Sequence, residues 1–77
     1  RENWKAKLQE YFQQDGAILP QYRTINESGP EHNKEFTVSV SLDDNSHSEQ
    51  GMGSSKKEAE QEAAKKLFNF LNNIKGL

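Results

Sequence analysis

The chain has 77 residues and a formal net charge of −2. This length fits one domain near the lower limit for a self-sufficient core, and the absence of cysteine excludes a disulfide framework. No apolar stretch is long enough for a membrane span, and the net charge excludes binding to an anionic partner through a broad positive field.

The first element expected is a helix that begins after Asn3, whose side chain can accept a hydrogen bond from the first turn. Its apolar residues recur at helical spacing and form one stripe, at Trp4, Leu8, Tyr11 and Phe12. The polar residues between them are expected to face solvent, namely Lys5, Lys7, Gln9, Glu10, Gln13 and Gln14. Gly16 is the expected helix stop.

Three strands are expected next, because short alternating segments lie between turn signals. Pro20 excludes helix and marks the entrance to a strand at residues 21–27, one side of which carries Tyr22, Thr24 and Asn26. After a turn at residues 28–30, the clearest alternation predicts a half-buried second strand with Phe36, Val38, Val40 and Leu42. A polar third strand is expected to return antiparallel at residues 46–53, with close approach allowed by Gly51 and Gly53.

A long second helix is expected to start after Ser55, which forms a capping box with Glu58. Its apolar stripe begins with small residues and continues with larger ones: Ala59, Ala63, Leu67, Phe70, Leu71 and Ile74. Gly76 is the expected stop. The order α-β-β-β-α predicts an α+β domain in which a three-stranded antiparallel sheet carries both helices on one face.

Lys56 and Lys57 stand where the second helix begins, which is the unfavourable end for a positive charge. A helix N-terminus also offers unpaired N–H groups, so two ammonium groups beside it indicate a phosphate-binding site. The alternative is a capped surface helix with solvated lysines. A second pair in mid-helix, Lys65 and Lys66, is assigned no role.

Two other segments are candidates for binding. His32 follows Gly29-Pro30-Glu31 in a loop between strands, where it is either part of an ordinary hairpin or a hydrogen-bonding group that enters a groove. On the first helix, Gln9, Glu10 and Gln13 form an array of amides and a carboxylate that suits sugar hydroxyls. The default alternative for these residues is an ordinary hydrated surface. The sequence contains no metal-ligand spacing and no nucleophile constellation, so it predicts neither a metal site nor a catalytic centre.

Taken in order, these segments resemble a double-stranded RNA-binding domain, and most closely the C-terminal domain of bacterial ribonuclease III. The resemblance covers about residues 3–71 and is carried by Leu8-Gln9-Glu10, Pro20-Gln21-Tyr22, Gly29-Pro30-Glu31-His32, the run from Gly51 to Glu60, and Ala63-Ala64. Leu-Gln-Glu in the first helix, and Glu60 in place of a third lysine, favour the ribonuclease III branch.

The resemblance implies three contact regions on duplex RNA. The helix face with Gln9, Glu10 and Gln13 would meet one minor groove, the loop with Pro30 and His32 would enter the next, and phosphates across the major groove would be bridged by Lys56, Lys57 and the amides after Ser55. Such a domain recognises A-form shape over roughly 16 base pairs with little sequence preference. The chain departs from the family pattern at two positions, with Ala6 in place of a hydroxyl residue and Glu60 in place of a third lysine. Both departures imply weaker RNA affinity than strongly basic members show.

We therefore expect a single double-stranded RNA-binding domain at residues 1–77, with its core at about residues 3–74, taken from a larger protein. The resemblance implies a module that is neither an enzyme nor cofactor-dependent, with Mg²⁺ confined to the nuclease domain of a ribonuclease III parent. It also implies a monomeric isolated domain, a homodimeric parent, a cytoplasmic location and no membrane partner. Two alternatives stay open: a protein-interaction module of the same fold, and a domain of another RNA-processing or regulatory protein.

Overall fold

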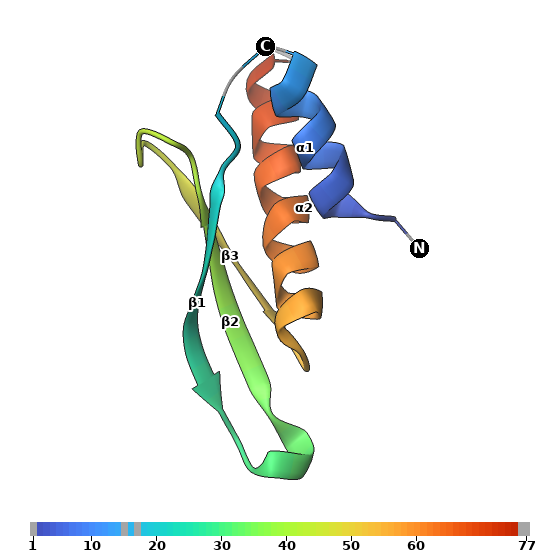
Figure 1. The fold of residues 1–77 in the computed structure, drawn as a ribbon, viewed down its shortest axis with the longest axis vertical. Coiled ribbons are helices and arrows are strands. Elements are labelled where there is room, and N and C mark those ends of the chain that lie inside the picture. Colours follow the sequence, from blue (N-terminus) through green and yellow to red (C-terminus); the bar gives the residue numbers. More distant parts are fainter. Residues whose placement is uncertain (1, 15, 17, 76–77) are drawn as a thin grey trace.

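A three-stranded antiparallel sheet carries two helices on one of its faces, as the sequence predicts (Figure 1). The structure is a computed structural model that describes residues 2–14, 16 and 18–75. In chain order the elements are α1 (Trp4–Gln14), β1 (Gln21–Ser28), the short 3-10 helix η1 (Glu31–Asn33), β2 (Glu35–Ser41), β3 (Ser48–Gly53) and α2 (Lys56–Lys75). The predicted α-β-β-β-α order is confirmed, and η1 is an additional turn between the first two strands. The expected stop at Gly76 lies outside the described residues.

Strand β2 lies in the middle of the sheet, with β1 and β3 paired antiparallel on its two sides. Because successive side chains of a strand point to opposite faces, every second residue of β2 faces the helices. Two of these, Val38 and Val40, are completely buried. The predicted alternation of the second strand is therefore confirmed.

Strand β1 departs from simple alternation at Ile25. Thr24 pairs with Val38, whereas Asn26 pairs with the next residue back, Thr37, so Ile25 is an extra residue and forms a β-bulge. The predicted side shared by Tyr22, Thr24 and Asn26 is wrong beyond the bulge, because the extra residue turns Asn26 to the other face of the sheet.

Helix α2 packs directly on β2 and β3, and α1 packs on α2. Gly51 in β3 makes this possible, since a Cβ atom there would lie 2.2 Å from the backbone nitrogen of Ala63 and 2.5 Å from the backbone oxygen of Ala59. The predicted close approach at Gly51 is confirmed. The buried cluster that results joins both helices to the sheet through Leu8, Val40, Ala63, Ala64 and Leu67.

The apolar stripe predicted for α2 needs two corrections. Phe68 lies outside it, yet its ring packs against Trp4 and Tyr11 of α1, with centroid separations of 5.7 and 6.4 Å. A helix between a sheet and another helix needs apolar residues on two sides, and one stripe accounts for only one of them. Ile74 was expected in the stripe but is 53% exposed. It lies near the C-terminal end of α2, which extends beyond the loop between β2 and β3 (Figure 1).

Candidate nucleic-acid interface

The predicted site residues are all exposed, and they occupy three places on the molecule. Helix α1 carries Gln9, Glu10 and Gln13, the loop between β1 and β2 carries Pro30 and His32, and the start of α2 carries Ser55, Lys56 and Lys57. The molecule measures 42 Å along its long axis, and along that axis the start of α2 lies between α1 and the loop (Figure 1). The lysine pair thus has the middle position among the three.

The start of α2 is fixed by side-chain caps. The hydroxyl oxygen of Ser55 accepts a hydrogen bond of 3.1 Å from the backbone N–H of Glu58, which confirms the predicted cap. The carboxylate of Glu58 in return accepts hydrogen bonds from the N–H (3.0 Å) and the hydroxyl (3.1 Å) of Ser54, one residue before the partner that a capping box predicts. The first N–H groups of a helix have no partner within the helix. In the described first turn of α2, the N–H of Glu58 bonds to the hydroxyl of Ser55 and the N–H of Ala59 bonds to its carbonyl. Within this described turn, the N–H groups of Lys56 and Lys57 are therefore left for an outside acceptor.

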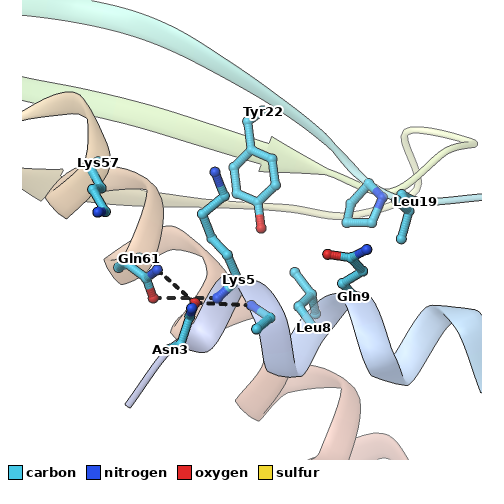
Figure 2. A pocket seen from close by; sticks show the side chains of 10 residues that line it. Asn3, Lys5, Leu8, Gln9, Leu19, Tyr22, Lys57 and Gln61 are labelled. Atoms are coloured by element: carbon cyan, nitrogen blue, oxygen red, sulfur yellow. Dashed lines mark hydrogen bonds between the residues drawn. The ribbon is translucent and has the colours of Figure 1, made fainter. Parts of the chain in front are cut away.

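A shallow groove joins α1 to the start of α2. Its lining includes Gln9 from α1, Lys57 and Gln61 from α2, and Tyr22 from β1 (Figure 2). An amide suited to sugar hydroxyls and an ammonium group suited to phosphate therefore share one surface.

Lys5 was expected to face solvent, and its side chain is 39% exposed, but it also contacts both α2 and β1. Its Nζ lies 2.6 Å from the carboxylate of Glu60 on α2. The same Nζ lies 5.0 Å from the ring centroid of Tyr22, beside which Lys5 is drawn in Figure 2. Burial, and to a smaller extent the negative charge of Glu60, raises the pKa of Tyr22 to about 12. The Glu60 carboxylate near the lysine pair thus has Lys5 as its own cationic partner.

The loop after β1 is a tight turn with His32 at its surface. Gly29 has a φ of +92°, which strains residues with a side chain, and the N–H of Asn33 donates a 2.9 Å hydrogen bond to the carbonyl of Pro30. Pro30 also lines a second hollow together with Ser54, so the loop adjoins the turn that leads into α2.

Two acidic side chains near the loop, Glu27 and Glu31, share one lysine as partner. Lys34 lies 2.7 Å from Glu27 and 3.4 Å from Glu31. The hydrogen bond and charge of Lys34 hold the pKa of Glu27 below its usual value, and the charge of Lys56 adds a smaller effect in the same direction. The negative charge of Glu27 is therefore partly offset by Lys34 and, to a smaller extent, by Lys56.

Sequence reasoning missed the contacts that place α1 on α2. Gln61 accepts a 2.7 Å hydrogen bond from the backbone N–H of Trp4 and donates a 2.9 Å hydrogen bond to the side chain of Asn3. These partners are 57 and 58 positions apart, so no local pattern indicates them.

The described residues contain no group of three or more His, Cys, Asp or Glu side chains that could hold a metal ion. They also contain no helix long and apolar enough to cross a membrane.

Comparison with known proteins identifies relatives over most of the chain. The family model for the double-stranded RNA binding motif matches residues 4–71. Ribonuclease 3 of Leptospira interrogans serogroup Icterohaemorrhagiae is 52% identical over 67 residues, which is 87% of this chain and 27% of that protein. Ribonuclease 3 of Streptococcus agalactiae serotype Ia is 50% identical over 69 residues, or 90% of this chain and 30% of that protein.

Among solved structures, the solution structure of both double-stranded RNA-binding domains of DRB4 with their linker is similar. It has a TM-score of 0.68 and 37% sequence identity, and the match covers 91% of this chain and 44% of that one. The chain thus spans less than a third of the length of the two ribonucleases and under half of the DRB4 chain.

Proposed function

This chain belongs to the double-stranded RNA binding motif family, and from that premise we propose that it binds duplex RNA by A-form shape, without catalysing a reaction. A-form RNA has a major groove too narrow for side chains and a wide, shallow minor groove that displays 2′-hydroxyls. A rigid domain recognises such a helix by touching two successive minor grooves and the phosphates between them.

Each of the three exposed regions takes one part of that contact. Gln9, Glu10 and Gln13 of α1 meet 2′-hydroxyls and base edges in one minor groove. Pro30 and His32 enter the next minor groove with the loop, whose tight turn keeps the imidazole at the surface.

Lys56 and Lys57 bridge the phosphates of the intervening major groove, together with the N–H groups that follow Ser55. The observation that carries this proposal is the order of the three regions along the long axis, with the lysine pair in the middle (Figure 1). A phosphate bound there meets a positive helix end and two ammonium groups at once.

The test compares two double variants with the same change of net charge. Lys56→Ala with Lys57→Ala removes the proposed phosphate contact, whereas Lys65→Ala with Lys66→Ala removes an exposed pair from the middle of the same helix. Titrations with duplex RNA, single-stranded RNA and duplex DNA at one salt concentration should show preference of the wild type for duplex RNA. We expect the first variant to lose at least tenfold in RNA affinity, or about 1.4 kcal/mol, and the second to lose little. Equal losses would indicate attraction by total charge and contradict the proposal.

We further propose that the chain positions substrate for the nuclease domain of a ribonuclease III, since both ribonuclease relatives carry that name. In this proposal the parent is a cytoplasmic homodimer, and its Mg²⁺ belongs to the nuclease domain. Deletion of residues 3–74 from the parent should raise KM for long duplex RNA and leave kcat nearly unchanged. A selective loss of kcat would contradict a positioning role.

The net charge of −2 favours one alternative, a protein-interaction module of the same fold. A nucleic-acid-binding domain is usually basic. The same titration separates the two functions, because a protein-interaction module would show no preference for duplex RNA over single-stranded RNA and duplex DNA.

A further inference from the structure

We propose that Gln61 is a positioning residue that sets where α1 presents its RNA-contacting face relative to the lysine pair. This inference rests on the proposed function and assigns a role to a residue outside the three contact regions. Gln61 lies in the groove between Lys57 on α2 and Asn3 at the start of α1 (Figure 2).

The start of α1 depends on Gln61 for its backbone hydrogen bonds. The side-chain oxygen of Gln61 accepts the N–H of Trp4 at 2.7 Å and makes a longer contact with the N–H of Lys5 at 3.4 Å. Asn3 supplies the other acceptors, since its side chain takes the N–H of Ala6 at 3.1 Å and its carbonyl takes the N–H of Lys7 at 3.1 Å. Thus a side chain of α2 caps the N-terminus of α1.

Gln61 also holds the local cap in place. Its side-chain nitrogen donates a 2.9 Å hydrogen bond to the same oxygen of Asn3 that accepts the N–H of Ala6. The preceding residue of α2, Glu60, adds the 2.6 Å contact to Lys5. Two consecutive residues of α2 therefore bind the first turn of α1.

Apolar packing alone would leave the position of α1 less well defined. Leu8 lies in the buried cluster and Trp4 packs on Phe68, but apolar burial is non-directional and tolerates rotation and sliding. Hydrogen bonds restrict donor–acceptor distance and angle. The contacts of Gln61 thus set both the axial position and the rotation of α1.

The position of α1 matters for RNA because shape recognition requires a fixed spacing between contacts. Gln9 lies on α1 and Lys57 on α2, and both line the groove that contains Gln61. A duplex presents its minor-groove hydroxyls and phosphates at set distances, so a displaced α1 cannot reach the minor groove while Lys57 holds the phosphates. Release of Gln61 should therefore weaken RNA binding without any loss of a residue that touches RNA.

The experiment uses Gln61→Met, which keeps the size of the side chain and removes its hydrogen bonds, with Gln50→Met as the matched control. Gln50 is exposed in β3, where it pairs with Ser39. Residual dipolar couplings measured by NMR report the orientation of α1 relative to α2 in the free protein. Titrations with duplex RNA and duplex DNA over a range of salt concentrations report binding.

We expect Gln61→Met to reorient α1, to lower duplex RNA affinity about five- to tenfold, and to lower the ratio of RNA to DNA affinity by a similar factor. The salt dependence should stay at the wild-type value, because the lysines remain. Gln50→Met should change none of these quantities. General destabilisation would instead reduce RNA and DNA binding alike.

An unmoved α1, or a reoriented α1 with an unchanged ratio of RNA to DNA affinity, would overturn the inference. Failure of the proposed function is a different result. A wild-type chain without preference for duplex RNA would overturn that function before any variant is measured, and the positioning role would fall with it.

Discussion

The structure gives Glu60 a partner that the sequence does not indicate. In the sequence it stands beside Lys56 and Lys57 as an acid that reduces the positive charge available for phosphate. In the structure its carboxylate contacts Lys5 at 2.6 Å, with 26% of the Glu60 side chain exposed. A partly exposed pair of this kind contributes about 0.2–1 kcal/mol to stability. Glu60 thus supplies a contact between the helices, while its weakening effect on RNA affinity remains a prediction.

The Tyr22 hydroxyl makes stability depend on pH at the alkaline end. Its pKa is raised to about 12, first by burial and then by Glu60, so the folded chain holds this proton more tightly than the unfolded chain does. The stabilising contribution is complete below the unfolded pKa of about 10 and is lost as pH rises through the folded value.

We expect the free energy of unfolding of the wild type to fall between about pH 10 and 12 by about 1 kcal/mol more than that of Tyr22→Phe, after allowance for the partial exposure of the ring. Urea unfolding at several pH values in this window measures the difference. Lysine deprotonation occurs in both proteins and cancels in the comparison. Parallel pH profiles would show that the phenol does not titrate differently on folding.

Gly51 is the position in β3 where a small change should have a large effect. An alanine Cβ there would lie 2.2 Å from the backbone nitrogen of Ala63, and backbone cannot rotate away as a side chain can. We expect Gly51→Ala to lower the free energy of unfolding by about 3 kcal/mol or more, as measured by urea denaturation. Gln50→Ala, on the opposite face of the same strand, should stay within about 0.5 kcal/mol of the wild type. A mild effect at Gly51 would mean that α2 can move off the sheet easily.

Helix α2 and strand β1 show which parts of the fold local patterns can predict. The buried side of α2 was predictable because Ala59, Ala63 and Leu67 recur at helical spacing. The second side, with Phe68 against Trp4, depends on where α1 packs, which periodicity along one helix does not indicate. The bulge at Ile25 is likewise a property of the pairing between β1 and β2, and no glycine or proline marks it in the sequence.

The loop between β1 and β2 depends on Gly29 for its shape. The φ of Gly29 is +92°, and a Cβ there would lie 2.5 Å from the carbonyl oxygen of Asn33. We expect Gly29→Ala to reshape η1, to lower duplex RNA affinity several-fold, and to reduce the free energy of unfolding by about 1–3 kcal/mol.

The control for this loop is Ser28→Ala, an exposed position at the end of β1. Binding titrations and thermal unfolding of both variants measure the two effects separately. RNA affinity unchanged by Gly29→Ala would remove the loop, and with it His32, from the proposed contact.

At the scale of the whole molecule, the sequence could predict which residues are candidates for binding, but not the contacts that arrange them in space. His32 and Lys56 were predicted as candidates from residue type, local position and the family resemblance, and the structure places both at the surface. Their arrangement depends on Gln61 and Lys5, whose partners lie more than 50 positions away in the sequence. Sequence reasoning could therefore name the groups proposed to touch RNA, but not the contacts that hold them at a common spacing.

The small number of cations at the proposed phosphate contact should show in the salt dependence of binding. Each cation that neutralises a phosphate contributes about 0.9 to the slope of log affinity against log salt on B-form DNA, taken here as a guide for duplex RNA. With Lys56 and Lys57 in that role, the wild-type slope should be near −2, shallow for a nucleic-acid binder. Lys56→Ala with Lys57→Ala should bring the slope close to zero, whereas Lys65→Ala with Lys66→Ala should leave it unchanged. A wild-type slope several times steeper would mean that cations elsewhere on this acidic chain carry the binding, and that the order of the three regions along its long axis is not the basis of recognition.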